Sequence, residues 1–158
     1  MAIKYFCILL TSCLLVATQM NAQRVPGKIK LKDLILVIDI SDFSLFKSIA
    51  LKANYFFSDS TGPNIEGRRT YEVKDTANEN KIWVVEFENR IEGLSFFTHQ
   101  EDLVEDFREQ LLKGGFAVTE NKKDLQYLEK GELTIIITKE ISDSHEAKFR
   151  FDFIKLYK

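Results

Sequence analysis

Two stretches of this chain have the pattern of a helix that ends in a sharp turn and continues as a strand. They are ALKANYFFSDS (50–60) and LLKGGFAVTEN (111–121). Asn54 aligns with Gly115, and both residue types tolerate the left-handed backbone conformation that commonly ends a helix. An aromatic residue follows in each case. The sequence therefore predicts two units of similar construction, each with a helix that leads into strands.

The first unit is predicted to begin with two helices. The segment LKDLILVID (31–39) spaces its apolar residues as a helix does, although its β-branched residues would also suit a strand. Next, Ser41 or Asp42 can accept hydrogen bonds from the free amides at a helix N-terminus. Apolar residues then recur at helical spacing along 43–53. We therefore expect a short helix followed by a second one.

A third helix is predicted before the second turn. The residues THQE (98–101) have the pattern of a capping box, in which the first and last residues exchange hydrogen bonds with each other's amides. Val104, Phe107 and Leu111 follow at helical spacing. The carboxylates of this helix are interpreted as a solvated face and not as a metal site, because no convergent ligands accompany them.

Outside the helices the apolar residues alternate with a period of two, as in strands. In KIWVVEFE (81–88) we expect Trp83 and Val85 to face the core, with Val84 and Glu86 on the other face. Further strands are predicted in TYEVK (70–74), LSFF (94–97), DLQYLE (124–129), ELTIIITKE (132–140) and KFRFDFIKLYK (148–158).

The last of these strands has the clearest alternation. Phe149, Phe151 and Phe153 share one face, and Arg150 and Asp152 share the other. Short turn segments separate the predicted strands, which favours antiparallel pairing.

Together these elements predict an α+β fold. We expect one antiparallel sheet built from two repeated helix-plus-four-strand units, with the helices packed on one face. The length of 158 residues suits a single domain, placed at 31–158, with pseudo-repeats at about 31–98 and 99–158.

This order of elements resembles the β-lactamase-inhibitor-like architecture, and small outer-membrane assembly lipoproteins of the SmpA type share a related single unit. The residues that carry the resemblance are LKDLILVID…FSLFKSIALKANYFF and EDLVEDFREQLLKGGFAV, each leading into strands. The second unit has one predicted helix where that family has two, and the disulfides of the inhibitor are absent. The resemblance implies a small exported bacterial protein, and it assigns no functional residue.

The N-terminus has the order of a secretory signal peptide. Lys4 supplies a positive charge, an apolar run follows, and the small residue Ala22 marks an exit. The apolar run at 5–18 is shorter than the roughly 20 residues that span a bilayer. We expect residues 1–22 to be the signal peptide and residues 23–30 to be a flexible lead-in.

Both cysteines of the chain, Cys7 and Cys13, lie in this leader. An alternative is that LTSC (10–13) is a bacterial lipobox, in which Cys13 would carry a lipid. We favour the ordinary signal peptide, because the residues after Cys13 continue the apolar run. The mature chain would then have no thiol, which excludes disulfides, cysteine nucleophiles and thiolate metal sites.

The sequence offers few features of an enzyme or a nucleic-acid binder. The net charge is −2 and neither sign forms a long block, so we expect no nucleic-acid partner. His99 and His145 are expected at the surface without a role. The chain contains no glycine-rich phosphate loop and no G-x-S-x-G motif. We therefore predict no enzymatic activity, no cofactor and no metal.

The face of the sheet opposite the helices is the predicted binding surface. It mixes charged and apolar groups, as protein interfaces do. The sequence favours an exported, periplasmic or secreted, non-enzymatic domain that binds another protein or a component of the bacterial cell envelope. The alternative is a small hydrolase or ligand carrier whose groups converge only in three dimensions. The predicted members of the binding surface are Val84, Glu86, Phe97, Arg150 and Asp152.

Overall fold

The computed structural model describes residues 28–75, 80–139 and 148–156 of the chain. In these ranges the chain forms three helices and one antiparallel sheet of eight strands, which confirms the predicted α+β class. The helices are α2 (Leu31–Ile40), α3 (Phe43–Lys52) and α4 (Glu101–Lys113). The strands are β1 (Tyr55–Ser60), β2 (Arg69–Asp75), β3 (Asn80–Phe87), β4 (Arg90–Thr98), β5 (Ala117–Lys122), β6 (Leu125–Lys130), β7 (Leu133–Lys139) and β8 (Phe149–Lys155).

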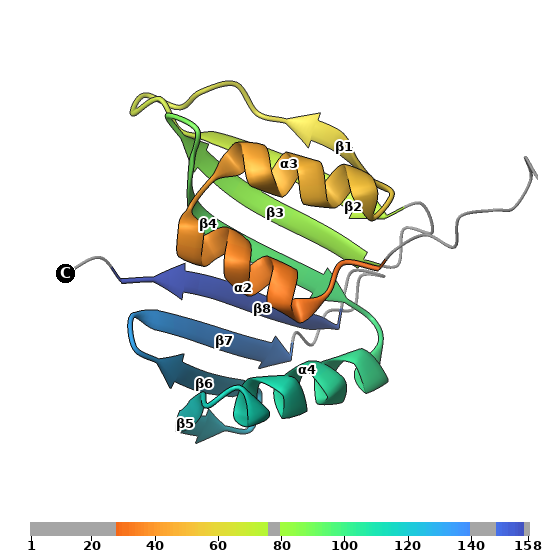
Figure 1. Cartoon of the computed structure of the whole chain (residues 1–158), viewed down its shortest axis with the longest axis vertical. Coiled ribbons are helices and arrows are strands. Elements are labelled where there is room, and N and C mark those ends of the chain that lie inside the picture. Colours follow the sequence, from red (N-terminus) through yellow and green to blue (C-terminus); the bar gives the residue numbers. More distant parts are fainter. Residues whose placement is uncertain (1–27, 76–79, 140–147, 157–158) are drawn as a thin grey trace, which may run out of the picture.

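The sheet consists of two four-strand meanders that meet at its centre. The strand order is β1-β2-β3-β4-β8-β7-β6-β5. The two meanders are joined by the antiparallel pairing of β4 with β8, in which Phe96 lies opposite Phe151. Helices α2 and α3 precede the first meander and α4 precedes the second. All three helices lie on the same face of the sheet, as predicted (Figure 1).

Both predicted helix-to-strand turns are confirmed. The φ angle is 58° at Asn54 and 85° at Gly115, so both residues have the left-handed conformation. Each turn places a buried aromatic ring, Tyr55 or Phe116, next to the core at the start of the following strand.

The first strand of each meander also carries a β-bulge at the corresponding position. The register shifts between Phe57 and Asp59 in β1 and between Val118 and Glu120 in β5. A bulge bends an edge strand and increases its twist. This agreement supports the two-unit interpretation, while a common origin of the units stays a prediction.

Replacing Gly115 with alanine is expected to destabilise the protein by about 1–2 kcal/mol, because a Cβ is strained in the left-handed region. Space is available, since the nearest atom to an added Cβ is Cε of Lys130 at 3.9 Å. Gly115→Asn should cost less, because Asn54 already fills the matching position. Urea denaturation measures both variants, and equal destabilisation by alanine and asparagine would contradict this account.

The caps of the helices agree with the sequence at α3 and differ at α4. Oδ1 of Asp42 accepts hydrogen bonds from the amides of Ser44 at 2.7 Å and Leu45 at 3.1 Å, so Asp42 caps α3 as predicted. The predicted capping box of α4 is wrong. Thr98 is the last residue of β4 and is fully buried, and its Oγ1 accepts from the amide of Gln100 at 3.1 Å. The preceding strand therefore holds Thr98 away from the helix that it was expected to cap.

The core lies between the helices and the sheet. Phe107 of α4 packs against Phe96 and Phe151, with 5.6 Å between ring centroids in both pairs. Phe43 of α3 packs against Tyr71 of β2 at 4.6 Å. The largest fully buried side chains are Phe46, Phe96, Phe151, Phe153, Leu31, Leu34, Ile38, Ile82, Ile91, Leu111, Leu128 and Ile135.

The predicted orientation of β3 is wrong. Val84 is fully buried on the helix-covered face, whereas Trp83 is 42% exposed on the opposite face. Because residues 82–85 are all apolar, their alternation did not determine which side faces the core. The pairing of Val84 with Leu94 of β4, which is also buried, settles the orientation. Val84 therefore belongs to the core and not to a binding surface.

The core also begins earlier in the chain than predicted. Ile29 falls in the segment 23–30 that was expected to be a flexible lead-in, yet it is 5% exposed and packs in the core. The predicted signal peptide, residues 1–22, lies outside the described residues. None of the helices in the described ranges has the length and hydrophobicity needed to cross a bilayer.

Candidate functional site

The face of the sheet without helices, here called the open face, is formed by side chains that alternate with the buried core residues. It carries both charged and apolar side chains, with an aromatic group near its middle. The members discussed below are Glu72, Lys81, Trp83, Ser95, Phe97, Arg150 and Asp152.

Three of the five predicted binding residues lie together on the open face. Phe97 pairs with Arg150 across β4 and β8. Nε of Arg150 donates to Oδ2 of Asp152 at 2.9 Å. Oγ of Ser95 donates to the other carboxylate oxygen of Asp152 at 2.5 Å. These contacts link β4 and β8 at the junction of the two meanders.

The other two predicted residues do not belong to this face. Val84 is in the core, as described above. Glu86 pairs with Ile91, which is buried on the helix-covered face. The Glu86 carboxylate accepts a hydrogen bond from the amide of Asn89 at 2.6 Å. Glu86 therefore stabilises the β3–β4 turn and is not placed to contact a partner on the open face.

Trp83 and Phe97 form an aromatic pair, although they were predicted to lie on opposite faces of the sheet. Their ring centroids are 4.7 Å apart, and the planes of the two rings meet at 61°. The ammonium group of Lys81 lies 4.8 Å from the Trp83 ring and 5.0 Å from the Phe97 ring, within the range of cation–π attraction. Lys81, Trp83 and Phe97 are here called the aromatic cluster. Trp83 is its exposed member, because Phe97 is only 5% exposed.

A carboxylate fixes the orientation of this cluster. Nε1 of Trp83 donates to Oε2 of Glu72 at 3.0 Å. The other oxygen of Glu72 accepts from Nζ of Lys74 at 2.8 Å and from Oγ of Ser58 at 3.1 Å. Lys74, with the indole N–H of Trp83 and the hydroxyl of Ser58, lowers the pKa of Glu72 to about 2. Glu72 is therefore ionised throughout the neutral range and holds the indole in place.

The stability that Glu72 contributes is expected to disappear in acid. Its folded-state pKa of about 2 lies below the ordinary value of 4.5, so the unfolded chain takes up this proton first as the pH falls. The contribution is complete above about pH 4.5 and is lost as the pH falls toward 2. Urea denaturation at about pH 6 and about pH 3 should show a smaller loss of stability for Glu72→Gln than for the wild type.

The exposed carboxylate of Glu129 on β6 provides the control for this measurement. Between the two pH values, Glu129→Gln and the wild type should lose the same amount of stability. If Glu72→Gln and the wild type lose equal stability, the account of Glu72 is wrong.

Beside Trp83 the open face has a small hollow of about 210 Å³. Thr61, Thr70, Glu72 and Trp83 line it. Thr61 and Thr70 are joined by a hydrogen bond from the Thr61 amide to the Thr70 carbonyl at 2.9 Å. The exposed tryptophan thus borders a shallow, partly polar depression.

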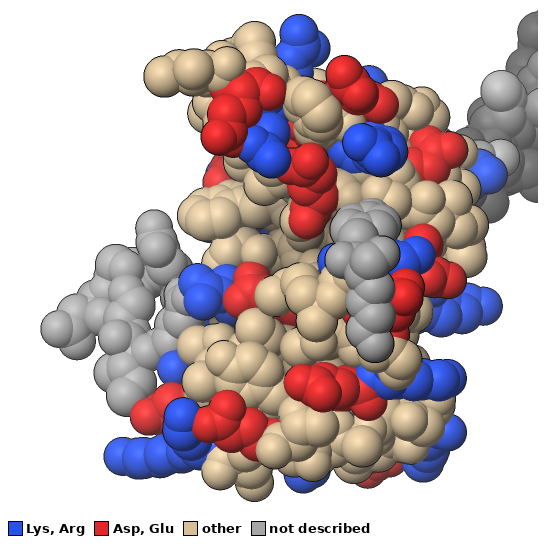
Figure 2. Space-filling view, turned by 90° about the vertical axis from the view of Figure 1, so that its left-hand side faces the viewer, with Lys and Arg blue, Asp and Glu red and all other residues tan. Residues whose placement is uncertain are grey.

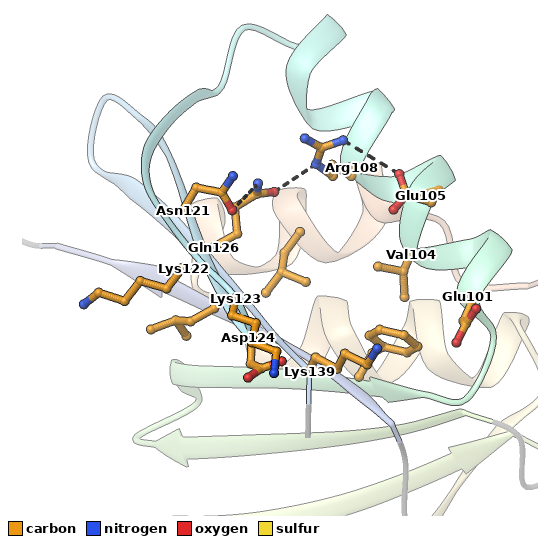
Figure 3. Close-up of a pocket in the computed structure, with 13 residues that line it drawn as sticks. Glu101, Val104, Glu105, Arg108, Asn121, Lys122, Lys123, Asp124, Gln126 and Lys139 are labelled. Carbon is orange, nitrogen blue, oxygen red and sulfur yellow. Dashed lines mark hydrogen bonds and ion pairs between the residues drawn. The ribbon is translucent and has the colours of Figure 1, made fainter. Parts of the chain in front are cut away.

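A larger cavity of about 370 Å³ lies on the helix-covered side, between α4 and the hairpin of β5 and β6 (Figure 3). Helix α4 forms one wall and the hairpin forms the other, with β7 and β8 contributing to the floor. The lining residues are Glu101, Val104, Glu105, Arg108, Asn121, Lys122, Lys123, Asp124, Leu125, Gln126, Ile137, Lys139 and Phe149.

Hydrogen bonds connect the two walls at one end of this cavity. Nε of Arg108 on α4 donates to Oε1 of Gln126 on β6 at 3.0 Å. Nε2 of Gln126 donates to Oδ1 of Asn121 on β5 at 3.4 Å. A guanidinium nitrogen of Arg108 also lies 3.7 Å from Glu105. This end of the cavity is therefore closed by polar groups that already have partners.

Charges of both signs alternate on the side of the molecule shown in Figure 2, and no large area there carries one sign. Arg68 pairs with both Glu66 and Glu92. In the described ranges, no group of three or more histidine, cysteine, aspartate or glutamate side chains could hold a metal ion. His99 is exposed, and the prediction for His145 falls outside the described residues.

The parts of the site that depend on contacts between different strands were not predicted from the sequence. Trp83 is the sole tryptophan of the chain and follows a lysine, which is the signal that could have singled it out. Its partner Glu72 lies on the neighbouring strand β2, where it pairs with Trp83. A scan against protein-family models and searches of curated proteins and of solved structures find no match to this chain.

Proposed function

We propose that this protein is a non-enzymatic binding domain of the bacterial cell envelope, and that it contacts a partner protein through the open face. The observation that carries this proposal is the aromatic cluster beside Glu72. Trp83 exposes 42% of its surface, although tryptophan is a residue type that proteins usually keep largely buried. Tryptophan is also enriched among the residues that dominate the energy of protein interfaces.

The polar atom of Trp83 does not oppose burial by a partner. Its indole N–H already donates to Glu72, so a partner can cover the ring without leaving a donor unpaired. Lys81 and Phe97 restrict the ring further. A side chain that is held in place before binding loses less conformational entropy on association.

Charged groups around the cluster suit a protein partner better than a nucleic acid. Arg150 and Asp152 are paired and half-buried near Phe97, which gives an apolar centre with a polar surround. Such mixed charges favour orientation and selectivity in protein association. A nucleic-acid surface would need a continuous basic area.

Photo-cross-linking in the cells that make the protein tests this proposal. A photoreactive phenylalanine analogue is placed at Phe56, an exposed aromatic residue that pairs with Lys74 on the open face. The control position is Leu51, which is 61% exposed on α3. A discrete protein adduct is expected from position 56 only, and Trp83→Ala in the same chain should abolish it. The proposal fails if neither position gives an adduct, or if Trp83→Ala leaves the yield of the adduct at position 56 unchanged.

The export of the chain is part of the same proposal. It is supported by the order of charge, apolar run and small residue in 1–22. Mass spectrometry of the protein from fractionated cells should find Gln23 as the N-terminus, in the periplasm or the medium. A lipid-modified Cys13 would instead identify a lipoprotein, and an intact N-terminus in the cytoplasm would contradict export.

A further inference from the structure

The cavity between α4 and the β5–β6 hairpin has the size and composition of a small-molecule site. Its volume of about 370 Å³ falls within the range of roughly 300–1,000 Å³ that is typical of ligand pockets. It lies beside α4 on the helix-covered side of the sheet, whereas the aromatic cluster lies on the open face, so the two sites are independent. The residues that line it therefore need their own explanation.

The floor of the cavity is apolar. Val104 of α4, Ile137 of β7 and Phe149 of β8 are buried, and Leu125 of β6 is half-buried beside them. These side chains come from four different elements and converge on one space. An apolar floor with a few polar groups at its edge is the usual composition of a pocket that binds a small organic molecule.

Charged side chains without an ion pair in the described ranges lie on different sides of the cavity. Lys139 at the end of β7 and Lys123 in the hairpin have no ion pair among the described residues. Glu101, the first residue of α4, likewise has none within those ranges. Figure 3 shows Lys139 extending from the sheet toward the side on which Glu101 lies.

The other charged groups are less suited to hold a ligand. Lys122 pairs with Glu120, and Figure 3 shows its ammonium group directed away from the cavity. Arg108 is occupied by Gln126 and Glu105. The charges left for a ligand are thus cationic on the sheet side and anionic at the start of α4, with Asp124 next to Lys123 in the hairpin.

We propose that this cavity binds a zwitterion with an apolar side chain, namely an amino acid or a short peptide. The carboxylate would pair with Lys139 and Lys123, and the ammonium group would pair with Glu101. The side chain would lie on the floor formed by Val104 and Phe149. Each charged end of such a ligand meets a group of opposite sign that has no partner in the described part of the chain, and charge-assisted hydrogen bonds are the strong ones.

Titration followed by NMR amide shifts of the purified protein tests the ligand class. The dipeptide Leu-Leu should shift the amide signals of residues that line the cavity, including Leu125 and Ile137. N-acetyl-Leu-Leu lacks the ammonium group and Leu-Leu-amide lacks the carboxylate, and each should bind about tenfold more weakly. Decanoate, an anionic chain without an ammonium group, should also bind more weakly than Leu-Leu.

Substitutions at the charged side chains test which of them bind the charged ends of the ligand. Lys139→Gln and Glu101→Gln should each weaken Leu-Leu binding about tenfold. The controls are Lys113→Gln and Glu109→Gln, which remove an exposed ion pair of 2.9 Å elsewhere on α4 and should leave binding unchanged. Because all four residues are exposed, their replacement should not disturb folding, and circular dichroism checks this.

Several results would overturn the proposal. The first is that no probe shifts the cavity signals at roughly 10 mM, a concentration that would detect even weak binding. The second is that either blocked dipeptide binds as tightly as Leu-Leu. The third is that decanoate binds more tightly, which would indicate a site for anionic amphiphiles. Trp83→Ala should not alter the titration, so this test fails or succeeds separately from the proposal for the open face.

Discussion

Replacing Phe151 with alanine is expected to lower the free energy of unfolding by about 3–5 kcal/mol. The ring is fully buried in β8 and packs against Phe96 of β4 and Phe107 of α4. Its loss would therefore open a cavity at the point where both meanders and α4 meet. Because folded domains are stable by only about 5–15 kcal/mol, this single change removes a large part of the total.

Urea or guanidinium denaturation followed by circular dichroism measures this effect. Phe56→Ala is the matched control, because it removes the same side chain from a position that is 44% exposed, and it should cost far less. If Phe151→Ala is too unstable to purify, Phe151→Leu should fold with a smaller loss, since it leaves a smaller cavity. Comparable losses for Phe151→Ala and Phe56→Ala would show that the core is not organised around β8.

Replacing Trp83 with alanine is expected to weaken binding of the partner by at least about 2 kcal/mol, or roughly thirtyfold in Kd. The proposed interface would lose its exposed aromatic ring while the fold is retained, because Trp83 lies outside the core. The dissociation constant of the protein captured at position 56 is the quantity to measure. Leu51→Ala, at an exposed position on α3, should leave that constant unchanged.

The wild-type protein provides a second readout for the same surface. Trp83 is its sole tryptophan, so its fluorescence reports directly on the open face. Binding of the partner should change the emission, because the indole would pass from partial exposure to burial. Tight binding with unchanged emission would place the interface elsewhere and contradict the proposed role of the aromatic cluster.

Features that depend on neighbouring residues were predictable from the sequence. Asn54 and Gly115 end their helices as predicted, because the left-handed conformation is a local property of residue type. Phe149, Phe151 and Phe153 are buried as predicted, because charged residues alternate with them and leave one possible orientation. The α+β class follows from such local signals together.

Features that depend on pairing between distant segments were not predictable. In β3 the adjacent residues Trp83 and Val84 are both apolar and point to opposite faces. The sequence pattern is therefore equally consistent with either of them facing the core. Only the pairing of β3 with β4 distinguishes them. Thr98 has a residue type that caps helices, but its pairing with Phe149 in β8 keeps it in the sheet.

The larger cavity could not be inferred for the same reason. Its walls come from α4 and from the β5–β6 hairpin, and its floor includes Ile137 and Phe149. In the sequence these segments show ordinary amphipathic patterns. Of the adjacent lysines in the hairpin, Lys122 pairs with Glu120, whereas Lys123 has no ion pair in the described ranges.

The central position of β8 determines when the chain can fold. Of the described strands this one is synthesised last, yet it lies in the middle of the sheet. Ser95 and Asp152 form their hydrogen bond across 57 positions of sequence. Until β8 is available, β4 and β7 each have an unpaired edge and the core lacks Phe151. Such non-local pairing slows folding and leaves strand edges open to aggregation. For a chain that is exported as proposed, this delay would keep the polypeptide unfolded, and so able to pass through a translocation channel, until β8 has been synthesised.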